Sequence, residues 1–354
     1  MRVNKFMKMA IEEAEKGRGF VHPNPMVGAI IVKNGHVIGK GYHKAFGMEH
    51  AEVMAFRQAG EKAKDADMYI TLEPCIHHGK TPPCAPLIVK KGIKNVYVGI
   101  QDPNPLVNGK GIAYLKEHGI NVETGIYKNK ISELNRAYIK FHKKHLPFVT
   151  VKIATTLDGK IALFNGDAKW ITDEEMREWT HKLRNRFDGI LTGSGTILKD
   201  DPFLDTTPPR ERWHKFILDT YRKVPFDAHI FLNGKVVLFT ALHQYDVDKN
   251  PKGEVIQISM DEEHLSLKEV MKNIIKKGVL ELLVEAGPSL LTSLIKAKLV
   301  DEILHCINFS YLGNGMGFFN YTPTKLKDRI YLKNTQILKL GKGIIIRGKP
   351  SSQE

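Results

Sequence analysis

The strongest constraint on the fold is an alternation of helical and strand-like segments that is interrupted once, near residue 146. Before the interruption, Asn34-Gly35 separates two apolar runs, and this dipeptide is a strong signal for a hairpin. Hydrophobic spacing predicts helices at 3–14, 51–64 and 85–91 and strands at 27–33, 36–42, 68–72 and 95–100, and the alternation continues to about residue 126. We therefore expect a layered α/β domain with helices on both faces of its sheet.

The interruption is His145-Leu146-Pro147, which ends a helix predicted over 130–144. We place the domain boundary there, with domains at 1–145 and 147–354, as expected for 354 residues at ~100–200 residues per domain. In the second domain, Thr172–Glu175 has the pattern of a capping box that opens a helix to about Phe187. Strands are expected at 148–155, 189–192, 215–219, 235–239, 280–285, 302–307 and 343–347. The second half is thus predicted to be another α/β domain with its own core.

Composition excludes several classes of protein. No apolar run approaches the ~18–20 residues of a membrane span, so we expect no membrane protein. Residues 1–16 lack a signal-peptide core, and three cysteines favour a reducing compartment, which we take to be the cytoplasm. The net charge is +14, of which +10 lies in residues 1–146 (23 basic against 13 acidic). This excess suits a phosphorylated substrate or an RNA, although a solvated lysine-rich surface explains it equally well.

Three side chains of the first half form a candidate metal site. His50, Cys75 and Cys84 supply an imidazole and two thiolates, which are three ligands of a tetrahedral Zn²⁺ with a fourth position left for water. Both cysteines follow prolines at expected helix starts or turns, where a thiolate is favoured. Glu52 is not a ligand and is expected to carry protons as the catalytic acid and base. The order H-x-E…P-C…C is typical of zinc-dependent base deaminases.

The cysteine spacing narrows this class. Eight residues separate Cys75 from Cys84, whereas tRNA and cytidine deaminases have two between their cysteines. Together with Asn24–Gly28, Gly41–His43 and Gln101–Pro105, the stretch 72–84 makes the first half resemble the deaminase of riboflavin biosynthesis. The resemblance covers nearly all of residues 1–145. It implies a three-layer α/β/α cytidine-deaminase-like fold that binds Zn²⁺.

The same resemblance implies a set of deaminase substrate residues. Asn24 and His43 would face the substrate, and Lys80 would meet the ribose phosphate. Asp102 and Asn104 would line the ribosyl side. Each of the two asparagines flanks a proline, so turn formation is an alternative explanation for them. His77 and His78 are metal ligands by type, but the implied ligand set is complete without them.

The second half has two glycine-containing segments that follow predicted strands. Gly193-Ser-Gly195 would let a phosphate approach the backbone, but it lacks the third glycine of the dinucleotide fingerprint. Gly287-Pro288 places proline at the first position of a helix, whose free N–H groups suit a pyrophosphate. On motif grounds alone, ordinary glycine turns explain both segments better.

Residues 147–347 resemble the pyrimidine reductase that is fused to this deaminase in bacteria. The resemblance implies a dihydrofolate-reductase-like α/β fold that uses NADPH. The residues that it assigns to the cofactor are Ala154, Trp170, Thr196, Asp200, Gly287, Pro288 and Ser289. Those that it assigns to the pyrimidine substrate include Lys152, Arg184, Leu204 and Glu285.

Two positions depart from the reductase pattern. Ala168 stands where the family often has serine, and Thr207 stands where an arginine is expected. Arg210 is a candidate substitute for that arginine through a shifted loop. We keep these three positions in the expected substrate site, with their phosphate contacts in question. The stretch 311–333 suggests no chemistry.

The two resemblances together imply a bifunctional enzyme of riboflavin biosynthesis. The first domain would hydrolyse an exocyclic amine from a phosphoribosyl pyrimidine, and the second would reduce the ribosyl group to ribityl with NADPH. We expect a homo-oligomer that binds no nucleic acid and no membrane. Two alternatives stay open: an RNA-directed zinc deaminase with a fused non-catalytic domain, and a zinc-stabilised binding protein with a decayed reductase.

Overall fold

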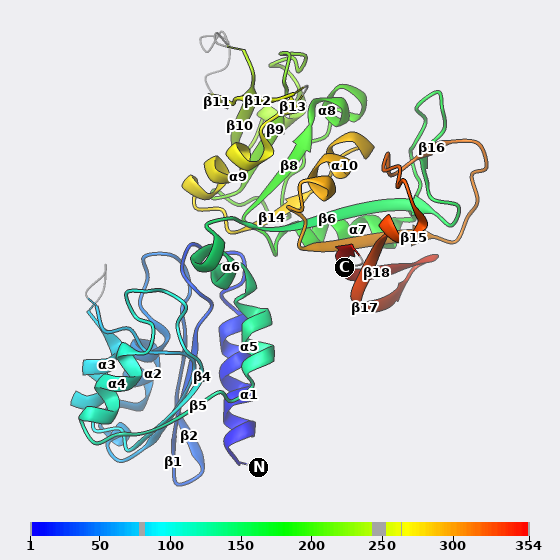
Figure 1. The fold of residues 1–354 in the computed structure, drawn as a ribbon. Coiled ribbons are helices and arrows are strands. Elements are labelled where there is room, and N and C mark those ends of the chain that lie inside the picture. Colours follow the sequence, from blue (N-terminus) through cyan, green and yellow to red (C-terminus); the bar gives the residue numbers. More distant parts are fainter. Residues whose placement is uncertain (1, 78–81, 243–252, 263, 353–354) are drawn as a thin grey trace. The chain divides into compact units, whose positions relative to one another are not determined.

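The chain forms two compact units, Met1–His145 and Leu146–Glu354 (Figure 1). The computed structural model describes residues 2–77, 82–242, 253–262 and 264–352. The predicted phosphate contact Lys80 and its neighbour His78 lie outside the described residues. Within those residues, no helix is both long enough and apolar enough to span a membrane.

The first unit follows the expected alternation closely. In chain order it contains α1 (Arg2–Glu15), β1 (Gly28–Lys33), β2 (His36–Tyr42), α2 (Ala51–Ala59), the 3₁₀ helix η1 (Gly60–Ala63), β3 (Asp67–Leu72), α3 (Cys84–Lys90), β4 (Asn95–Ile100), α4 (Lys110–Glu117), β5 (Asn121–Thr124), α5 (Lys128–Leu134) and α6 (Arg136–Lys144). Asn34 and Gly35 both have positive φ, 52° and 78°, as a tight hairpin turn between β1 and β2 requires. The predicted helix at 51–64 ends early, because Gly60 leaves the helical conformation and η1 follows.

The sheet of the first unit has the order β2-β1-β3-β4-β5, with β1 antiparallel to both neighbours and β3, β4 and β5 parallel. Helices α1 and α5 lie on one face, and α2, α3 and α4 lie on the other (Figure 1). A Cβ at Gly28 would lie 2.0 Å from the Ala10 oxygen of α1, and one at Gly41 would lie 2.0 Å from the Ala51 oxygen of α2. Both helices therefore pack directly on the sheet backbone, which confirms the three-layer expectation.

The single helix predicted at 130–144 is wrong. Asn135 separates α5 from α6, with φ −101° and ψ 23°. Its side chain accepts a hydrogen bond from the Met26 nitrogen (2.8 Å) and donates one to the Met26 oxygen (3.0 Å). These bonds reach across 109 residues, so local periodicity carries no sign of the break.

The second unit contains a larger set of strands than expected. Its elements are β6 (Phe148–Thr156), β7 (Lys160–Ala162), α7 (Glu174–Arg184), β8 (Gly189–Gly193), α8 (Ser194–Asp200), β9 (His214–Leu218), η2 (His229–Phe231), β10 (Lys235–Thr240), β11 (Gly253–Gln257), β12 (Met260–Asp261), β13 (His264–Leu265), α9 (Leu267–Lys276), β14 (Glu281–Val284), α10 (Pro288–Lys296), β15 (Glu302–Asn308), β16 (Met316–Gly317), η4 (Leu326–Asp328), β17 (Ile330–Leu340) and β18 (Gly343–Ser352). All the expected strands form. Strand β17 was not predicted from the sequence, and most of its residues are exposed.

These strands build a nine-stranded sheet of order β11-β10-β9-β8-β14-β6-β15-β18-β17. The seven strands from β11 to β15 are parallel, and β18 and β17 are antiparallel to their neighbours. Alternate side chains divide between two cores: Val151 and Val284 pack in one with α9 and α10, and Leu283 packs in the other with α7 and α8. Lys152 and Glu285 therefore point to the α7 and α8 face.

The start of α7 also differs from the prediction. The N-cap is Asp173, not Thr172, and its side chain accepts a hydrogen bond from the Met176 nitrogen at 2.9 Å. The helix ends at Arg184, three residues before Phe187. The third residue of the helix is Met176, so the reciprocal glutamate bond of a capping box does not form here.

The stretch 311–333 has a structural role. The Asp158 carboxylate, just after β6, accepts hydrogen bonds from the Leu312 and Gly313 nitrogens and from the Thr156 hydroxyl. These bonds lower the pKa of Asp158 to about 2, with the Thr156 hydroxyl making the largest contribution. Strand β16 then pairs with β7.

Candidate active sites

The three predicted metal ligands meet in the first unit. His50 precedes α2, Cys75 lies in the loop after β3, and Cys84 is the first residue of α3. His50 Nδ1 lies 3.3 Å from Cys84 Sγ and 3.5 Å from Cys75 Sγ, and the three ligand atoms lie within 4.8 Å of one another. Zinc bonded tetrahedrally to nitrogen and sulfur holds those atoms about 3.5 Å apart, so these residues fit zinc.

The two thiols have opposite pKa shifts. A hydrogen bond from the Cys84 thiol, with help from His50 and the Cys84 backbone N–H, lowers the pKa of Cys75 to about 4. The interaction with Cys75 and burial together raise the pKa of Cys84 well above its ordinary value. Two thiolates this close repel each other, and a shared divalent cation is what allows both to ionise. The donor set therefore suits a metal ion better than a pair of free thiols.

Glu52 lies beside this ligand set, in the first turn of α2. Its side chain is buried, with 3% of the residue exposed, and it shares a hydrogen bond with Cys84. Burial raises the pKa of Glu52, an effect that the nearby His50 only partly opposes. A carboxyl whose pKa is raised towards neutrality can both accept and return a proton.

Asn24 and His43 also lie at this site. The His43 ring meets the His50 ring edge-on, with centroids 5.8 Å apart. His43 Nδ1 faces the Glu49 oxygen at 3.0 Å and therefore carries the proton, so Nε2 accepts a hydrogen bond from Asn24 Nδ2 at 3.0 Å. Burial lowers the pKa of His43, which favours this neutral form.

Asp102 and Asn104 follow β4 and hold each other in place. Asp102 Oδ1 accepts hydrogen bonds from the Asn104 nitrogen (2.9 Å) and the Tyr138 hydroxyl (3.0 Å). Burial raises the pKa of Asp102 to about 6. The Asn104 side chain accepts from the Leu106 nitrogen, so the turn explanation for Asn104 is correct at the level of local structure.

Glu73 lies within the stretch 72–84, but no role was predicted for it from the sequence. Its buried carboxylate accepts four backbone hydrogen bonds, from residues 102, 109, 111 and 112. The only signal in the sequence that could have indicated a role for Glu73 is its position two residues before Cys75. The partners lie 29 to 39 residues away and could not be inferred.

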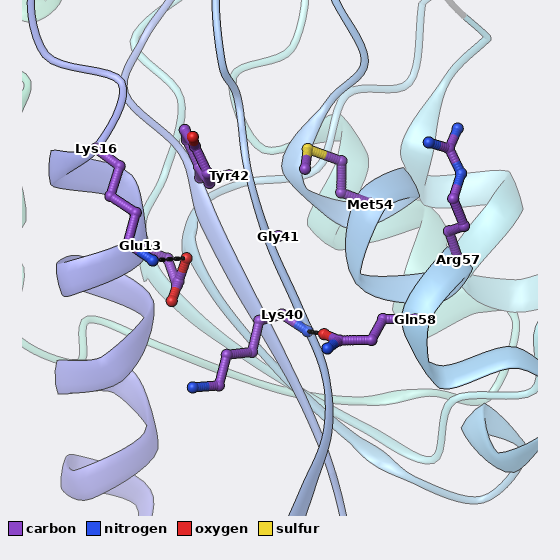
Figure 2. Close-up of a pocket in the computed structure, with 8 residues that line it drawn as sticks. All are labelled: Glu13, Lys16, Lys40, Gly41, Tyr42, Met54, Arg57 and Gln58. Carbon is purple, nitrogen blue, oxygen red and sulfur yellow. Dashed lines mark hydrogen bonds and ion pairs between the residues drawn. The ribbon is translucent and has the colours of Figure 1, made fainter.

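A separate pocket of about 480 Å³ opens elsewhere on the first unit. Figure 2 shows it between α1, which supplies Glu13 and Lys16, and α2, which supplies Met54, Arg57 and Gln58, with residues of β2 between them. Lys16 pairs with Glu13 at 2.7 Å, and Arg57 pairs with Glu49. None of the predicted deaminase residues that the structure describes lines this pocket.

In the second unit, three predicted substrate residues lie close together on one face of the sheet, near the carboxyl end of the central strand β14. Lys152 is on β6, Arg184 ends α7, and Glu285 follows β14. Arg184 donates from Nε and Nη2 to the two carboxylate oxygens of Glu285, at 2.9 and 3.2 Å. Burial alone would raise the pKa of Glu285, but Arg184 and Lys152 outweigh it, and the pKa lies below its ordinary value.

A second ion pair lies behind this one. Arg184 Nη1 donates to the Asp205 oxygen at 3.3 Å, and the Asp205 carboxylate pairs with Lys215, whose side chain is fully buried. Lys215 also donates to the Ile230 oxygen at 3.2 Å. No motif distinguishes Lys215 in the sequence, where it is one charge at the start of an apolar strand.

Of the expected NADPH residues, Thr196 follows β8, and Gly287, Pro288 and Ser289 follow β14, at the carboxyl ends of strands where open α/β sheets bind ligands. Gly287 is the N-cap of α10 and Pro288 its first residue. A Cβ added at Gly195 or Gly287 would meet no atom within 4 Å. Space beside free helix N–H groups fits an anionic cofactor. The other expected cofactor residues are Ala154 on β6, Thr196 and Asp200 on α8, and Ser289 on α10.

Ala168 and Trp170 lie in the loop between β7 and α7. Trp170 is 68% exposed and is therefore not a core residue. Its ring lies 4.7 Å from the Arg177 guanidinium. Arg177 therefore covers one face of the ring, although most of the side chain is exposed.

The three remaining substrate candidates lie on the loop after α8. Leu204 is buried, has a φ of 51°, and accepts a hydrogen bond from Trp213 Nε1 at 2.9 Å. Thr207 is exposed, and its backbone oxygen accepts from Asn185. Arg210 donates hydrogen bonds to the backbone oxygens of Asn185 and Phe187 at 2.9 and 3.0 Å. Its guanidinium therefore binds the chain just after the C-terminus of α7.

Comparison with known proteins identifies the chain. Residues 147–346 match the RibD C-terminal domain, and residues 1–100 match the cytidine and deoxycytidylate deaminase zinc-binding region. The chain belongs to the RibD family. It is 37% identical over 346 residues to the riboflavin biosynthesis protein RibD of Aquifex aeolicus, covering 96% of both chains, and 39% identical over 360 residues to that of Bacillus amyloliquefaciens, covering 98% of this chain and 95% of the relative.

Solved RibD structures show the same architecture. RibD of Acinetobacter baumannii superposes with a TM-score of 0.91 at 34% identity, over 99% of each chain. A deaminase/reductase from Thermotoga maritima gives 0.87 at 34% identity, over 99% of each chain. The chain is thus a bifunctional riboflavin biosynthesis enzyme, with a zinc-binding deaminase domain and an NADPH-dependent reductase domain.

Proposed function

We propose that this RibD protein deaminates 2,5-diamino-6-(5-phosphoribosylamino)pyrimidin-4(3H)-one by hydrolysis. It then reduces the ribosyl group of 5-amino-6-(5-phosphoribosylamino)uracil to ribityl with NADPH. The observation that carries this proposal is the convergence of His50, Cys75 and Cys84 around one point with the buried carboxyl of Glu52 beside them. Residues 1–145 form the deaminase domain and residues 147–354 the reductase domain.

In the deaminase, His50, Cys75 and Cys84 would hold Zn²⁺. Bound zinc lowers the pKa of a water molecule towards ~7 and so supplies a nucleophile at neutral pH. Glu52 would accept one proton from the attacking water at its carboxylate and pass it to the ring nitrogen, and it would then carry a second proton, from the hydroxyl formed on the ring carbon, to the departing amine. Neutral His43 and its partner Asn24 orient the pyrimidine, while Asp102 and Asn104 lie on the ribosyl side. Lys80 would neutralise the phosphate.

In the reductase, the residues mainly bind and orient, because the cofactor carries the hydride. The N-terminus of α10 at Gly287, Pro288 and Ser289 receives the cofactor phosphates. Ala154, Trp170, Thr196 and Asp200 contact the nicotinamide nucleotide. Lys152, Arg184 and Glu285 form the polar wall of the substrate site, with Leu204 on the adjoining loop. Ala168, Thr207 and Arg210 complete the proposed substrate set.

We further propose that the protein is a homo-oligomer. Strand β17 is an edge of the nine-stranded sheet, and its Ile337 and Leu338 are 68% and 52% exposed. Long edge strands with exposed apolar side chains favour pairing with another chain. Sedimentation at several concentrations measures the assembly state, and a monomer at all of them would contradict this proposal.

We also propose a cytoplasmic enzyme that acts on a small molecule and binds no nucleic acid or membrane. Cys75 and Cys84 are free thiols, and a reducing compartment keeps them available to a metal ion. The competing assignment, an RNA-directed deaminase, predicts ammonia release from RNA. Absence of that release, with release from the phosphoribosyl pyrimidine, would exclude it.

A coupled assay on one purified sample tests the proposal. We expect ammonia release from the diaminopyrimidine substrate, followed by oxidation of NADPH. Metal analysis should find one zinc per chain, and the Cys75→Ser variant should lose it, because a missing ligand costs several kcal/mol of affinity. Undiminished zinc in that variant would contradict the ligand set, and a sample that does not bind NADPH would indicate a decayed reductase.

A further inference from the structure

We infer that Glu73 is a positioning residue of the deaminase, whose buried carboxylate fixes the 102–112 segment, and with it Asp102, against the segment that carries Cys75. This inference rests on the proposed role of Asp102 in substrate binding. The four hydrogen bonds that the Glu73 carboxylate accepts all come from backbone N–H groups, so its effect passes through the backbone.

The hydrogen bonds of Glu73 involve both carboxylate oxygens. Oε2 accepts from the Asp102 and Gly109 nitrogens at 3.1 and 2.9 Å, and Oε1 accepts from the Gly111 and Ile112 nitrogens at 2.9 and 3.2 Å. Only 3% of Glu73 is exposed. Four backbone N–H groups, two of them buried, therefore depend on one side chain, and a buried N–H group is costly to leave without an acceptor.

A carboxylate is needed here because α4 cannot cap itself. Its N-cap is Gly109, which has no side chain to accept from the first-turn N–H groups. Glu73 supplies the acceptor from a distant part of the chain, with a negative charge that suits the positive end of the helix. A Cβ at Gly111 would lie 2.0 Å from the Pro74 oxygen, so the two backbone segments are in direct contact.

This arrangement connects two parts of the proposed site. Glu73 and Pro74 lead directly into the ligand Cys75, and the Glu73 side chain holds the backbone of Asp102. The Asp102 side chain then receives the Asn104 nitrogen and the Tyr138 hydroxyl. One carboxylate thus sets the distance between the metal-ligand segment and the ribosyl side. A displaced ribosyl side would therefore weaken substrate binding.

The Glu73→Gln variant tests this inference. Its amide group has the same shape, but the NH₂ end faces two N–H donors in place of accepting from them. We expect unchanged zinc content, a KM for the diaminopyrimidine raised about tenfold, and a kcat within about threefold of wild type, since the proposed contacts of Asp102 lie away from the reacting carbon. Amide hydrogen exchange should accelerate within 102–112. Glu61→Gln, at an exposed side chain of the same unit, is the matched control.

The outcomes distinguish a failure of the positioning role of Glu73 from a failure of the proposed deaminase function. Faster exchange together with the raised KM supports the positioning role. Faster exchange with an unchanged KM, or exchange like that of wild type, overturns it, as does an equal fall in kcat and zinc content, which would indicate a general structural role. A wild-type enzyme that releases no ammonia would instead overturn the proposed function, and the hydrogen exchange would still report whether Glu73 holds the segment.

Discussion

Each unit has a glutamate at its candidate site, buried in the first unit and partly buried in the second, and the pKa values of the two shift in opposite directions. Burial raises the pKa of Glu52, whereas Arg184 and Lys152 outweigh burial at Glu285 and lower its pKa. The first glutamate is suited to exchange a proton, and the second is held as a permanent anion within an ion pair. The comparison shows that neighbouring cations, more than burial, decide what a buried carboxyl can do.

The two sites are also assembled differently. The metal ligands and Glu52 lie within 35 residues of sequence, on the N-terminal ends of two helices and the loop between them. The Arg184–Glu285 pair joins residues 101 positions apart, and it depends on the parallel order of β8, β14 and β6. A change in the first site should therefore affect chemistry, and a change in the second should affect both binding and stability.

The largest effect is expected for Glu52→Gln. The amide cannot carry a proton between water and leaving group, so deamination should fall by about 10²–10⁴-fold. Zinc content and the NADPH-dependent reduction of supplied uracil substrate should be unchanged, because Glu52 is not a ligand and lies in the other unit. Rates of ammonia release and NADPH oxidation measure this. A loss below about tenfold would argue against the proton-transfer role.

Glu285→Gln should lower stability where Glu52→Gln does not. The amide leaves the buried Arg184 guanidinium without its anionic partner, which should reduce the unfolding free energy of the second unit by about 1.5–3 kcal/mol. Denaturant unfolding measures it. The control is Glu254→Gln, which breaks the exposed pair with Lys277 and should cost at most about 1 kcal/mol. Equal losses in the two variants would contradict the comparison.

Gly287→Val should weaken NADPH binding without affecting deamination. Its φ of −73° suits any residue, so the added side chain acts by filling space that we assign to cofactor phosphate. We expect affinity to fall at least about tenfold, equivalent to about 1.4 kcal/mol, in a titration by nicotinamide fluorescence. The smaller Gly287→Ala should lose less. Unchanged affinity in both variants would remove the phosphate assignment.

The smallest effects concern the pH dependence of stability, in which one titratable group of each unit should act in the opposite direction to the other. The pKa of Asp102 rises from 3.8 to about 6 on folding, so its contribution to stability is present below pH 3.8 and is lost as pH rises through about 6. The pKa of His305 is lowered by burial from 6.5 to about 4, so its contribution is present above pH 6.5 and is lost as pH falls through about 4.

Melting temperatures between pH 4 and 6.5 test this pair. Relative to Asp102→Asn, the wild type should lose stability as pH rises. Relative to His305→Gln, it should lose stability as pH falls. His264→Gln, at an exposed histidine of β13, is the control substitution. Slopes of the same sign for Asp102→Asn and His305→Gln would refute the opposite behaviour of the two groups.

The sequence allowed the layered fold and the metal site to be predicted because both depend on short-range patterns. Hydrophobic period and the Asn34-Gly35 turn are local, and few residue types bind zinc. The division of the 130–144 helix and the N-cap at Asp173 could not be predicted from such patterns. The first depends on hydrogen bonds between Asn135 and Met26, and the second on which of two adjacent polar residues turns back to the helix.

By itself, therefore, the sequence determined the chemical groups of this enzyme: an imidazole, two thiols and a carboxyl at a spacing that suits a zinc deaminase, followed by a second α/β domain. Only the tertiary structure decided the state of those groups. Glu52, Glu73 and Glu285 are the same residue type, yet one is buried beside thiols, one accepts four backbone N–H groups and one pairs with arginine. The reason is physical, since desolvation, charge and hydrogen bonding act through space and depend on neighbours that are distant in the chain.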